Sequence, residues 1–241
     1  MSFYEEIAEY YDHIFPFNRT QIQFVKGSLK EPYQNKRILD IGCGTGDLAI
    51  TLSEAGFTVT GMDSDPVMLQ KAVDKMTDSS VTFTRMDMRG IGDYCNPSTF
   101  DAVLCFGNTL VHLASIQEIE RLCKDVKHIL KQNGKFLLQI LNYNHILDHN
   151  IRSLPLIDNQ FITFERTYDY NTGKNLITFK TTLTVKETSK KITNKVYLFP
   201  IRKDELYLSL RNSGFSDISF YCDFDRSMLK ADSLPLVVEA S

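Results

Sequence analysis

The most informative stretch of this sequence is a glycine loop in which Gly42, Gly44 and Gly46 stand at every second position. It follows the apolar residues 37–41 and precedes residues 48–55, which have helical spacing. Glycine has no Cβ, so it adopts positive φ readily and lets the backbone lie against a ligand, at an entropic cost that an ordinary loop has no reason to bear. The pattern therefore predicts a strand, a binding loop for a bulky ligand, and a helix.

The spacing of these glycines argues against a dinucleotide. A dinucleotide fingerprint reads G-x-G-x-x-G, whereas here the third glycine comes one place early and Asp47 stands at the expected position. An acidic residue, Asp63, follows the next predicted strand at residues 57–62. For the glycines alone, a tight strand-to-helix turn is the alternative, but strand, loop, helix, strand and acid together favour a cofactor site.

The glycine loop and Asp63 together resemble motif I and the acidic post-motif of the class I S-adenosylmethionine-dependent methyltransferases. The resemblance implies that the loop passes under the methionine and ribose of S-adenosylmethionine and that Asp63 takes the ribose hydroxyls. It also implies that Asp87, after the third strand, meets the adenine amino group; a surface-loop aspartate is the alternative there. The expected cofactor-binding residues are Tyr11, Asp40, Gly42, Cys43, Gly44, Gly46, Asp63, Ser64, Met68, Asp87, Met88 and Phe106.

Later motifs are similar to those of the glycine and sarcosine N-methyltransferase group, namely residues 107–113, 142–147 and 197–200, together with an insert of strands. The resemblance implies that Asn108 and His112 lie near the methyl acceptor, with catalytic and substrate-binding roles. The alternative for Asn108 is a helix N-cap or turn residue, and for His112 a satisfied, half-buried histidine. The further expected substrate-binding residues are Leu141, Tyr143 and Tyr197.

Leu141 departs from the pattern of the glycine enzymes, which carry an arginine there to hold the substrate carboxylate. A carboxylate brought into a partly buried site without a bidentate cation costs several kcal/mol. We therefore expect an acceptor that presents a neutral or hydrophobic group rather than glycine. Arg152 and Arg166, in the insert, are alternative cations for the same place.

The expected reaction is methylation of a nitrogen or an oxygen by in-line displacement. Because the sulfonium donor is already activated, the protein mainly has to align two groups, which supplies up to ~7–11 kcal/mol, whereas a general base adds about 10² to 10⁴ in rate. If His112 acts as that base, its ordinary pKa of about 6.5 suits neutral pH. No catalytic triad or metal site is required, and none is expected from the sequence.

The elements around these residues alternate between strand and helix, which predicts an α/β fold with a Rossmann-like, doubly wound, mostly parallel seven-stranded sheet. By the resemblance, the last two strands make one edge antiparallel. The helix that begins after Ser115 is expected to end at Asn133 and Gly134. Because ligands of such sheets bind beyond the carboxyl ends of the strands, the glycine loop, Asp63, Asp87 and residues 106–112 should form one site. The predicted strands are residues 37–41, 57–62, 81–85, 100–106, 135–141, 217–224 and 236–240.

The whole chain, residues 1–241, is predicted to be a single methyltransferase domain with four parts. Residues 1–30 are expected to form an N-terminal helical lid that begins with one amphipathic helix; core packing is the alternative. Residues 37–141 are the cofactor-binding core, and residues 203–241 supply the last helix and the edge strands. Within residues 159–199 the hydrophobic pattern alternates, which predicts three antiparallel strands that must bury one face, over the acceptor or in a subunit contact.

The composition limits the classes of function. Of 241 residues, 30 are acidic and 27 basic, so the net charge of −3 lacks the basic excess that binds nucleic acid. A small-molecule acceptor is therefore expected; an RNA methyltransferase, a non-catalytic S-adenosylmethionine-binding module and a nicotinamide oxidoreductase are the alternatives. The five cysteines are scattered and expected to be reduced, and no apolar run reaches the ~18 residues of a membrane span. A cytoplasmic location is predicted, with a homodimer left open.

Overall fold

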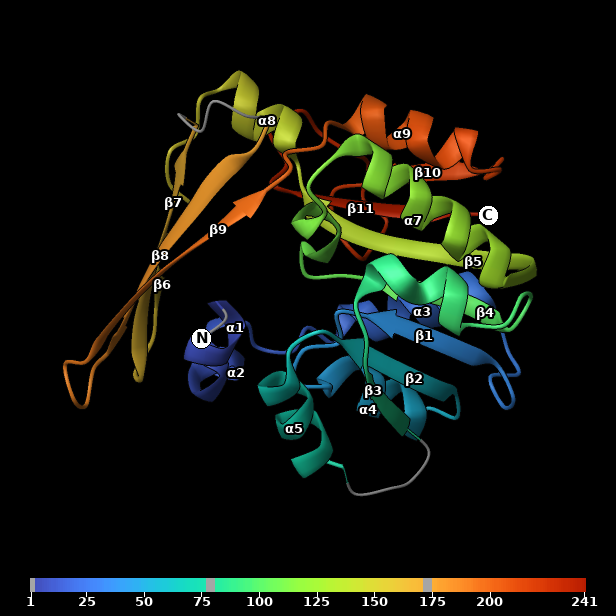
Figure 1. Cartoon of the computed structure of the whole chain (residues 1–241), viewed down its shortest axis with the longest axis horizontal. Helices are drawn as coiled ribbons and strands as arrows, with labels where there is room; N and C mark the ends of the chain where they lie inside the picture. The colour runs from blue at the N-terminus through green and yellow to red at the C-terminus, as the bar shows by residue number, and fades with distance from the viewer. Residues whose placement is uncertain (1–2, 77–80, 171–174) are drawn as a thin grey trace.

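Two β-sheets organise the chain in the computed structural model, which describes residues 3–76, 81–170 and 175–241. In the described residues, one sheet has seven strands in the order β10-β11-β5-β4-β1-β2-β3, and the other has four in the order β6-β7-β8-β9. Figure 1 shows the smaller sheet standing apart from the larger one, with the short N-terminal helices between them.

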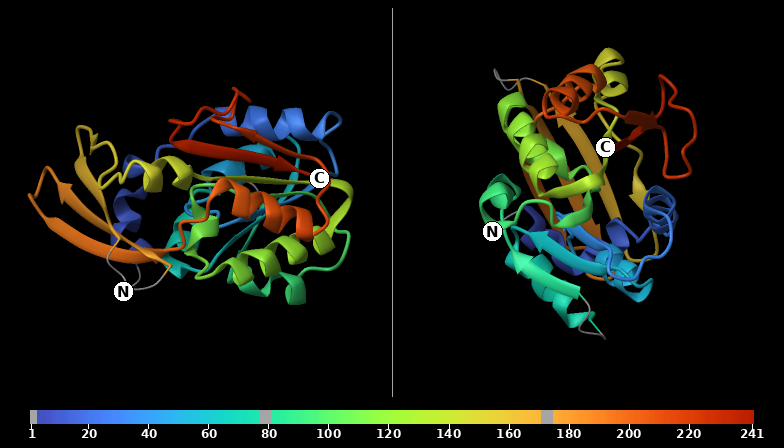
Figure 2. Two further views of the ribbon diagram at one scale, coloured as in Figure 1. Left: turned by 90° about the horizontal axis from the view of Figure 1, so that it is seen from above. Right: turned by 90° about the vertical axis from the view of Figure 1, so that its right-hand side faces the viewer.

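The seven-stranded sheet has the predicted topology. Strands β1 to β5 pair in parallel, whereas β11 is antiparallel to both β5 and β10, so the predicted antiparallel edge is confirmed. Figure 2 shows α3 on one face of this sheet and α7 and α9 on the other. The strands are β1 (Arg37–Ile41), β2 (Thr58–Asp63), β3 (Val81–Arg85), β4 (Phe100–Cys105), β5 (Leu130–Leu141), β10 (Ile218–Tyr221) and β11 (Pro235–Ala240). The helices are α3 (Thr20–Leu29), α4 (Asp47–Glu54), α5 (Pro66–Asp74), η2 (Met88–Gly90), α6 (Ile91–Tyr94), η3 (Thr109–His112), α7 (Ile116–Ile129), α8 (Tyr143–Asp148) and α9 (Lys203–Asn212).

Helix α7 begins as predicted but ends earlier. Ser115 Oγ accepts a hydrogen bond from the Glu118 N–H, and the Glu118 carboxylate accepts one from the Ala114 N–H, which satisfies the free donors of the first turn. The prediction that Asn133 and Gly134 end the helix is wrong. Strand β5 already pairs with β4 at Leu130, and the pairing is then interrupted by a bulge around Asn133, which has a positive φ.

The insert has four described strands instead of the three that alternation predicted. The additional strand β6 (Ile157–Asp158) is too short for its pattern to be read from the sequence, and it pairs with β7 (Ile162–Asp169). Strands β8 (Ile177–Val185) and β9 (Lys191–Leu198) complete the sheet, and every pairing within it is antiparallel. Residues 171–174, between β7 and β8, lie outside the described residues.

The N-terminal segment is broken into three short helical pieces, so the prediction of one continuous amphipathic helix is wrong. The pieces are α1 (Phe3–Ile7), η1 (Ala8–Tyr10) and α2 (Tyr11–Ile14). Their apolar side chains still bury one face, because Ile7 and Ile14 pack with three inner-face residues of the insert: Ile162, Phe164 and Leu183.

The opposite side of the N-terminal segment is joined to the glycine loop by polar contacts. Asp12 accepts a hydrogen bond from Thr45 Oγ1 at 2.6 Å and pairs with Lys75 Nζ at 2.6 Å. The segment therefore connects the insert to the cofactor-binding core. None of the helices in the described ranges is long and apolar enough to cross a membrane.

Candidate functional site

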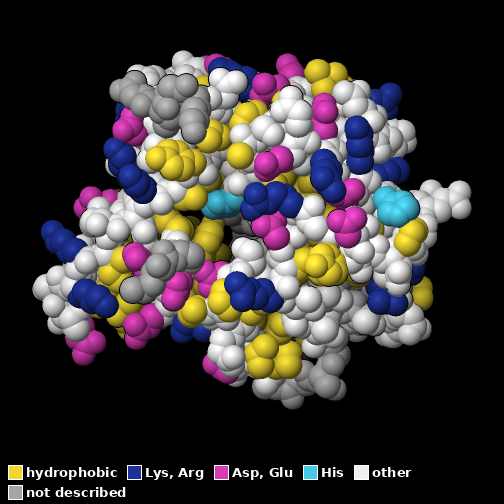
Figure 3. Space-filling view, viewed as in Figure 1, with side chains coloured by type: hydrophobic (Ala, Val, Ile, Leu, Met, Phe, Trp, Pro, Cys, Tyr) yellow, Lys and Arg dark blue, Asp and Glu magenta, His cyan; other side chains and the backbone are white. Residues whose placement is uncertain are grey.

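A cavity of about 420 Å³ lies at the carboxyl ends of β1, β2 and β4, a volume typical of small-molecule sites. Its walls come from the glycine loop, the end of β2, the segment after β3, the segment after β4, and the N-terminal helices. Val196 of β9 completes the lining from the insert. The space-filling view shows a hollow between the insert and the main part of the molecule, bordered by hydrophobic, charged and histidine side chains (Figure 3).

The glycine loop is folded back onto β2. The N–H groups of Gly42 and Cys43 both donate to the Met62 carbonyl, at 2.8 and 3.0 Å. A Cβ on Gly42 would lie 2.5 Å from the Thr109 side chain, so glycine at this position allows the loop to touch the segment after β4. Gly44 lines the cavity beside Tyr11 and has a positive φ of 57°, which glycine adopts readily.

Asp63 is positioned by backbone donors. Its two carboxylate oxygens accept hydrogen bonds from the Gly44 N–H at 3.0 Å and the Asp65 N–H at 2.9 Å. Burial raises the pKa of Asp63, and these N–H donors act in the opposite direction. The carboxylate therefore lies in the cavity wall, where the two N–H donors fix its orientation and its oxygens can accept further hydrogen bonds from a ligand.

A second acid, Asp40, lies in the same wall at the end of β1 and is almost completely buried. Burial, and then the charge of Asp63, raise its pKa to about 7. Two carboxylates this close make the wall favourable for a cationic ligand and unfavourable for a pyrophosphate. This charge arrangement agrees with the glycine spacing, which also argued against a dinucleotide.

At the rim, Asp87 has a partner that the sequence did not suggest. Its carboxylate accepts two hydrogen bonds from the Arg89 guanidinium, at 2.9 and 2.7 Å, and a third from the Arg89 N–H. The Arg89 side chain is the main reason that the pKa of Asp87 is lowered. Both residues line the cavity, so the rim carries a paired charge.

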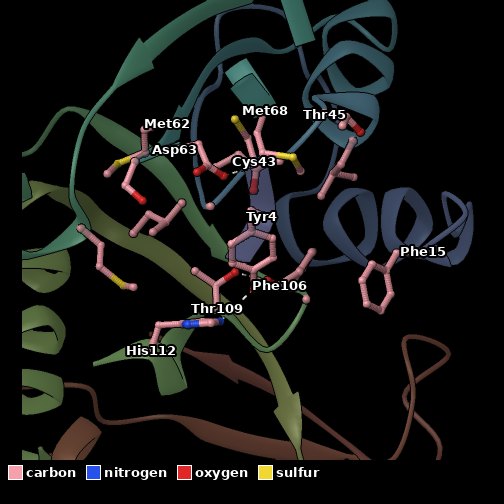
Figure 4. Close-up of a pocket in the computed structure, with 18 of the residues that line it drawn as sticks. Tyr4, Phe15, Cys43, Thr45, Met62, Asp63, Met68, Phe106, Thr109 and His112 are labelled. Carbon is pink, nitrogen blue, oxygen red and sulfur yellow. Dashed lines mark hydrogen bonds between the residues drawn. The ribbon is translucent and has the colours of Figure 1, made fainter. Parts of the chain in front are cut away.

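His112 lies in the cavity wall opposite Asp63 and points toward Tyr4 of α1 (Figure 4). The Tyr4 hydroxyl and His112 Nε2 are 2.8 Å apart. Burial lowers the pKa of His112 to about 4, so the imidazole is neutral at pH 7. Tyr4 was not among the residues predicted for the site, although tyrosines at positions 4, 10 and 11 mark the N-terminal segment in the sequence.

The predicted cofactor residues gather at this cavity. All of them line it except Gly46, which packs instead: a Cβ there would lie 2.7 Å from the Phe83 ring and 2.8 Å from Ala72. The residues predicted to bind the cofactor are therefore brought together in one cavity, and their contacts with the cofactor stay a prediction.

The predicted acceptor residues are less concentrated. Of them, only His112 lines the cavity. Asn108 donates from Nδ2 to the Tyr143 hydroxyl at 3.1 Å and accepts at Oδ1 from the Leu141 N–H at 3.0 Å. Tyr143 is fully buried, whereas Tyr197 is 54% exposed on the outer face of the insert. Hydrogen bonds thus connect Asn108 with Leu141 and Tyr143, and none of the three lines the cavity.

Comparison with known proteins places these features in a family. The family described as "Methyltransferase domain" matches residues 38–134. The chain is 32% identical to a glycine/sarcosine N-methyltransferase of Aphanothece halophytica over 222 residues, which cover 87% of this chain and 76% of that relative.

Solved structures share the fold. The CcbJ methyltransferase from Streptomyces caelestis superposes with a TM-score of 0.82 at 19% identity, over 97% of this chain and 95% of that one. An amino pentose methyltransferase from Micromonospora echinaspora, solved with S-adenosylmethionine bound, superposes with a TM-score of 0.68 at 16% identity, over 100% of this chain and 98% of that one.

Proposed function

Since this chain belongs to the class I S-adenosylmethionine-dependent methyltransferases, we propose that it transfers the methyl group of S-adenosylmethionine to a nitrogen atom of a small molecule. The observation that carries the proposal is the cover of the cavity: the N-terminal segment, which contacts the glycine loop through Tyr11 and Asp12, and Val196 of the insert complete the lining. A covered cavity of about 420 Å³ suits a cofactor and a small acceptor and leaves little room for a polymer.

The residues of the cavity fit S-adenosylmethionine. The Asp63 carboxylate, fixed by two backbone donors, is suited to accept from the paired hydroxyls of a ribose. Asp40 and Asp63 together supply negative charge for a ligand that carries a sulfonium and an ammonium. Gly44 and Met68 line the space where an adenosine would lie between the loop and α5.

The chain's own contribution to catalysis is alignment and exclusion of water. When bound, S-adenosylmethionine supplies a methyl group activated by its sulfonium. Tyr4, Tyr11 and Phe3 cover the cavity from the N-terminal segment, so an acceptor held beneath them is positioned and shielded from solvent. Alignment of this kind supplies up to ~7–11 kcal/mol of the barrier in well-oriented reactions, which is enough without a strong base.

His112 fits a positioning role better than that of a general base. A group with a pKa of about 4 holds a proton weakly at pH 7, so it accepts hydrogen bonds but captures few protons. Its contact with Tyr4 orients the ring toward the cavity. When Nε2 of the neutral imidazole carries the proton and donates to the Tyr4 hydroxyl, Nδ1 is free to accept a hydrogen bond from an acceptor N–H and so to aim the nitrogen lone pair at the methyl group.

Labelled S-adenosylmethionine tests this function. We expect transfer of label to small amines, with formation of S-adenosylhomocysteine in equal amount, and much less transfer to hydroxyl compounds. Asp63→Ala serves as a control that lowers turnover through cofactor binding. Transfer confined to RNA, or to hydroxyl groups, would contradict the proposal.

A further inference from the structure

The acceptor side of the cavity is lined by aromatic and apolar side chains. Phe3 and Tyr4 of α1 meet edge to face with their ring centres 5.0 Å apart, and the ring centres of Tyr4 and His112 are 5.6 Å apart. Phe3 also lies 6.1 Å from the ring centre of Phe179, which is the partner of Val196 in the pairing of β8 with β9. Phe3, Tyr4, His112 and Val196 all line the cavity, and we call these four residues the acceptor pocket. Helices α1 and η3 and strand β9 therefore supply one largely apolar wall.

The cavity offers almost no positive charge to a ligand. Among the described residues that line it, Arg89 is the only lysine or arginine, and its guanidinium already donates two hydrogen bonds to the Asp87 carboxylate. Asp40 and Asp63 add negative charge on the side opposite His112. A carboxylate or phosphate of an acceptor would thus lose its hydration without gaining a cation, and the two aspartates would repel it.

The two arginines of the insert that were alternative cations for the acceptor do not change this charge. Neither Arg152 nor Arg166 lines the cavity. The Arg152 guanidinium lies 4.4 Å from the centre of the Tyr170 ring, and Arg166 Nη2 donates to the Pro155 carbonyl at 2.6 Å. Recognition of the acceptor through an acidic group therefore has no support from the described lining.

The acceptor pocket also lacks a group that would remove a proton from an ammonium at pH 7. Burial lowers the pKa of His112 to about 4 and raises the pKa of Tyr4 above its usual range, so both side chains are neutral and hold few abstracted protons. The carboxylates of the described lining belong to the cofactor side and the rim, and they are Asp40, Asp47, Asp63 and Asp87. An amine must therefore be neutral before it enters the pocket.

This requirement separates two kinds of amine. An aliphatic amine with a pKa near that of lysine, about 10.4, has fewer than about one molecule in a thousand in the neutral form at pH 7. An aromatic amine is only weakly basic, because its lone pair is delocalised into the ring, and it is neutral at the same pH. The chemistry of the pocket therefore favours the aromatic kind.

We propose that the acceptor pocket binds an aromatic or heteroaromatic amine that is uncharged at pH 7 and carries no acidic group. The inference rests on the proposed function and names its substrate class. The rings of Phe3 and Tyr4 would pack against the ring of the acceptor, since aromatic rings favour edge-to-face and offset-stacked contacts. His112 Nδ1 would accept a hydrogen bond from the N–H of the amine.

The transfer step needs no base with such an acceptor. The lone pair of the neutral nitrogen forms the new N–C bond while the S–C bond of the donor breaks and its electron pair stays on sulfur. The positive charge thus passes from sulfur to nitrogen. Because the parent amine is weakly basic, its methylated cation is a strong enough acid to lose its proton to water.

Matched acceptors test the substrate class at pH 7 with saturating S-adenosylmethionine. Aniline is flat and uncharged, cyclohexylamine has a ring of the same size but is charged, and benzylamine combines a flat ring with a charged nitrogen. We expect kcat/KM for aniline to exceed the values for cyclohexylamine, benzylamine and glycine by at least about tenfold, because of the neutral fraction. 4-Aminobenzamide should exceed 4-aminobenzoate, which differs from it in the carboxylate, by at least about tenfold.

The pH dependence separates basicity from recognition of the ring. For benzylamine, kcat/KM should rise about tenfold between pH 7 and pH 8, since its neutral fraction rises by that factor. For aniline, which is neutral throughout, no such rise is expected. A flat profile for benzylamine with a value at pH 7 equal to that of aniline would mean that the protein removes the proton, and would overturn the proposal.

A cation introduced at Val196 tests the place of the pocket. Val196→Arg should raise kcat/KM for 4-aminobenzoate relative to 4-aminobenzamide by about 10- to 100-fold, the range for hydrogen bonds to a charged group. Thr193→Arg is the matched control: Thr193 is exposed on the other face of the same strand, so the ratio should equal that of the parent. Melting temperature and binding of S-adenosylhomocysteine show whether both variants are folded. An unchanged ratio in a folded Val196→Arg would overturn the assignment, and the acceptor series of the parent decides it if that variant does not fold.

Failure of this inference is distinguishable from failure of the function. If glycine, cyclohexylamine or benzylamine is methylated at pH 7 as efficiently as aniline, or 4-aminobenzoate as efficiently as its amide, the substrate class is overturned while methyl transfer to small amines stands. Transfer to aliphatic amines alone has the same meaning. Transfer to none of the amines, with label found in hydroxyl compounds or RNA, would overturn both.

Discussion

The two halves of the cavity are built in different ways. The cofactor half is built mainly from residues 40–68, which are close in sequence, and its shape there comes from the backbone: positive φ at glycines and N–H groups that hold Asp63. The acceptor half combines α1, η3 and β9, which are far apart in sequence, and its shape comes from side chains such as Tyr4 and His112. A site formed by the backbone of neighbouring residues can be predicted from the sequence, whereas a site formed by side chains from distant segments cannot.

The two halves also differ in charge. The cofactor half holds two buried carboxylates, Asp40 and Asp63, whereas on the other side of the cavity His112 is neutral at pH 7. A cationic cofactor would thus be drawn to the wall that carries the carboxylates.

The largest expected effect is a loss of stability when the backbone of the cofactor half is distorted. Gly46→Ala should lower the free energy of unfolding by about 2–5 kcal/mol, because φ is +83° and the new Cβ would lie 2.8 Å from Ala72. Gly107→Ala is the matched control, since its φ is also positive but no atom lies within 4 Å of its Cβ, which limits the loss to about 1–2 kcal/mol. Urea denaturation measures both. Equal losses would mean that packing against α5 does not require the glycine.

The next effect concerns cofactor binding. Asp63→Ala should weaken binding of S-adenosylhomocysteine by about 1.5–3 kcal/mol, because a carboxylate that accepts hydrogen bonds from the ligand is lost. Asp65→Ala is the control: Asp65 caps α5 through Val67 and Met68, so its loss should lower stability by about 1 kcal/mol and leave affinity nearly unchanged. Calorimetry at constant pH compares them. Normal affinity in Asp63→Ala would give Asp63 a purely structural role.

A smaller effect tests the charge of the cofactor half through pH. The pKa of Asp40 is raised by burial to about 7, so its contribution to the stability of the ligand-free protein is complete below about pH 4 and is lost as pH rises through 7. A cationic ligand favours the ionised form, so affinity for S-adenosylmethionine, which carries a sulfonium, should rise about tenfold from pH 6 to pH 8, with release of a proton.

Asp40→Asn provides the comparison for that experiment. The amide does not titrate, so both the loss of stability on raising the pH and the tenfold change in affinity should be absent. Calorimetry in buffers of different ionisation enthalpy counts the released protons. A parent whose affinity is flat between pH 6 and pH 8 would refute the assignment of this pH dependence to Asp40.

The smallest expected effect comes from removing the contacts between the N-terminal segment and the glycine loop. Asp12→Ala removes the contacts to Thr45 and Lys75, but the pair is partly exposed and contributes only about 0.5–1 kcal/mol. We expect a two- to fivefold rise in the KM for S-adenosylmethionine with little change in melting temperature. Asp158→Ala, which breaks an exposed pair with Lys186 on the insert, should leave that KM unchanged. An unchanged KM in Asp12→Ala would separate the N-terminal segment from cofactor binding.

Much of the fold was predictable because its signals are local. The alternation of apolar strands and helices, and the start of α7 after Ser115, are set by neighbouring residues and were predicted correctly. The end of α7 and strand β6 were not, because Leu130 extends β5 by pairing with Phe100, and β6 exists only by pairing with β7. The secondary-structure propensity of a short segment carries no information about the strand with which it pairs.

By itself, the sequence determined the cofactor half of this protein: glycine spacing and an acid after the next strand require a particular backbone path, and that path makes the site. Only the tertiary structure decided the acceptor half. Asn108, predicted near the acceptor, is hydrogen-bonded to Tyr143 and Leu141, whereas Tyr4 meets His112 only because the N-terminal segment folds over the cavity. The physical reason is that a side chain's partner across a fold is set by packing of distant segments, which no local pattern encodes.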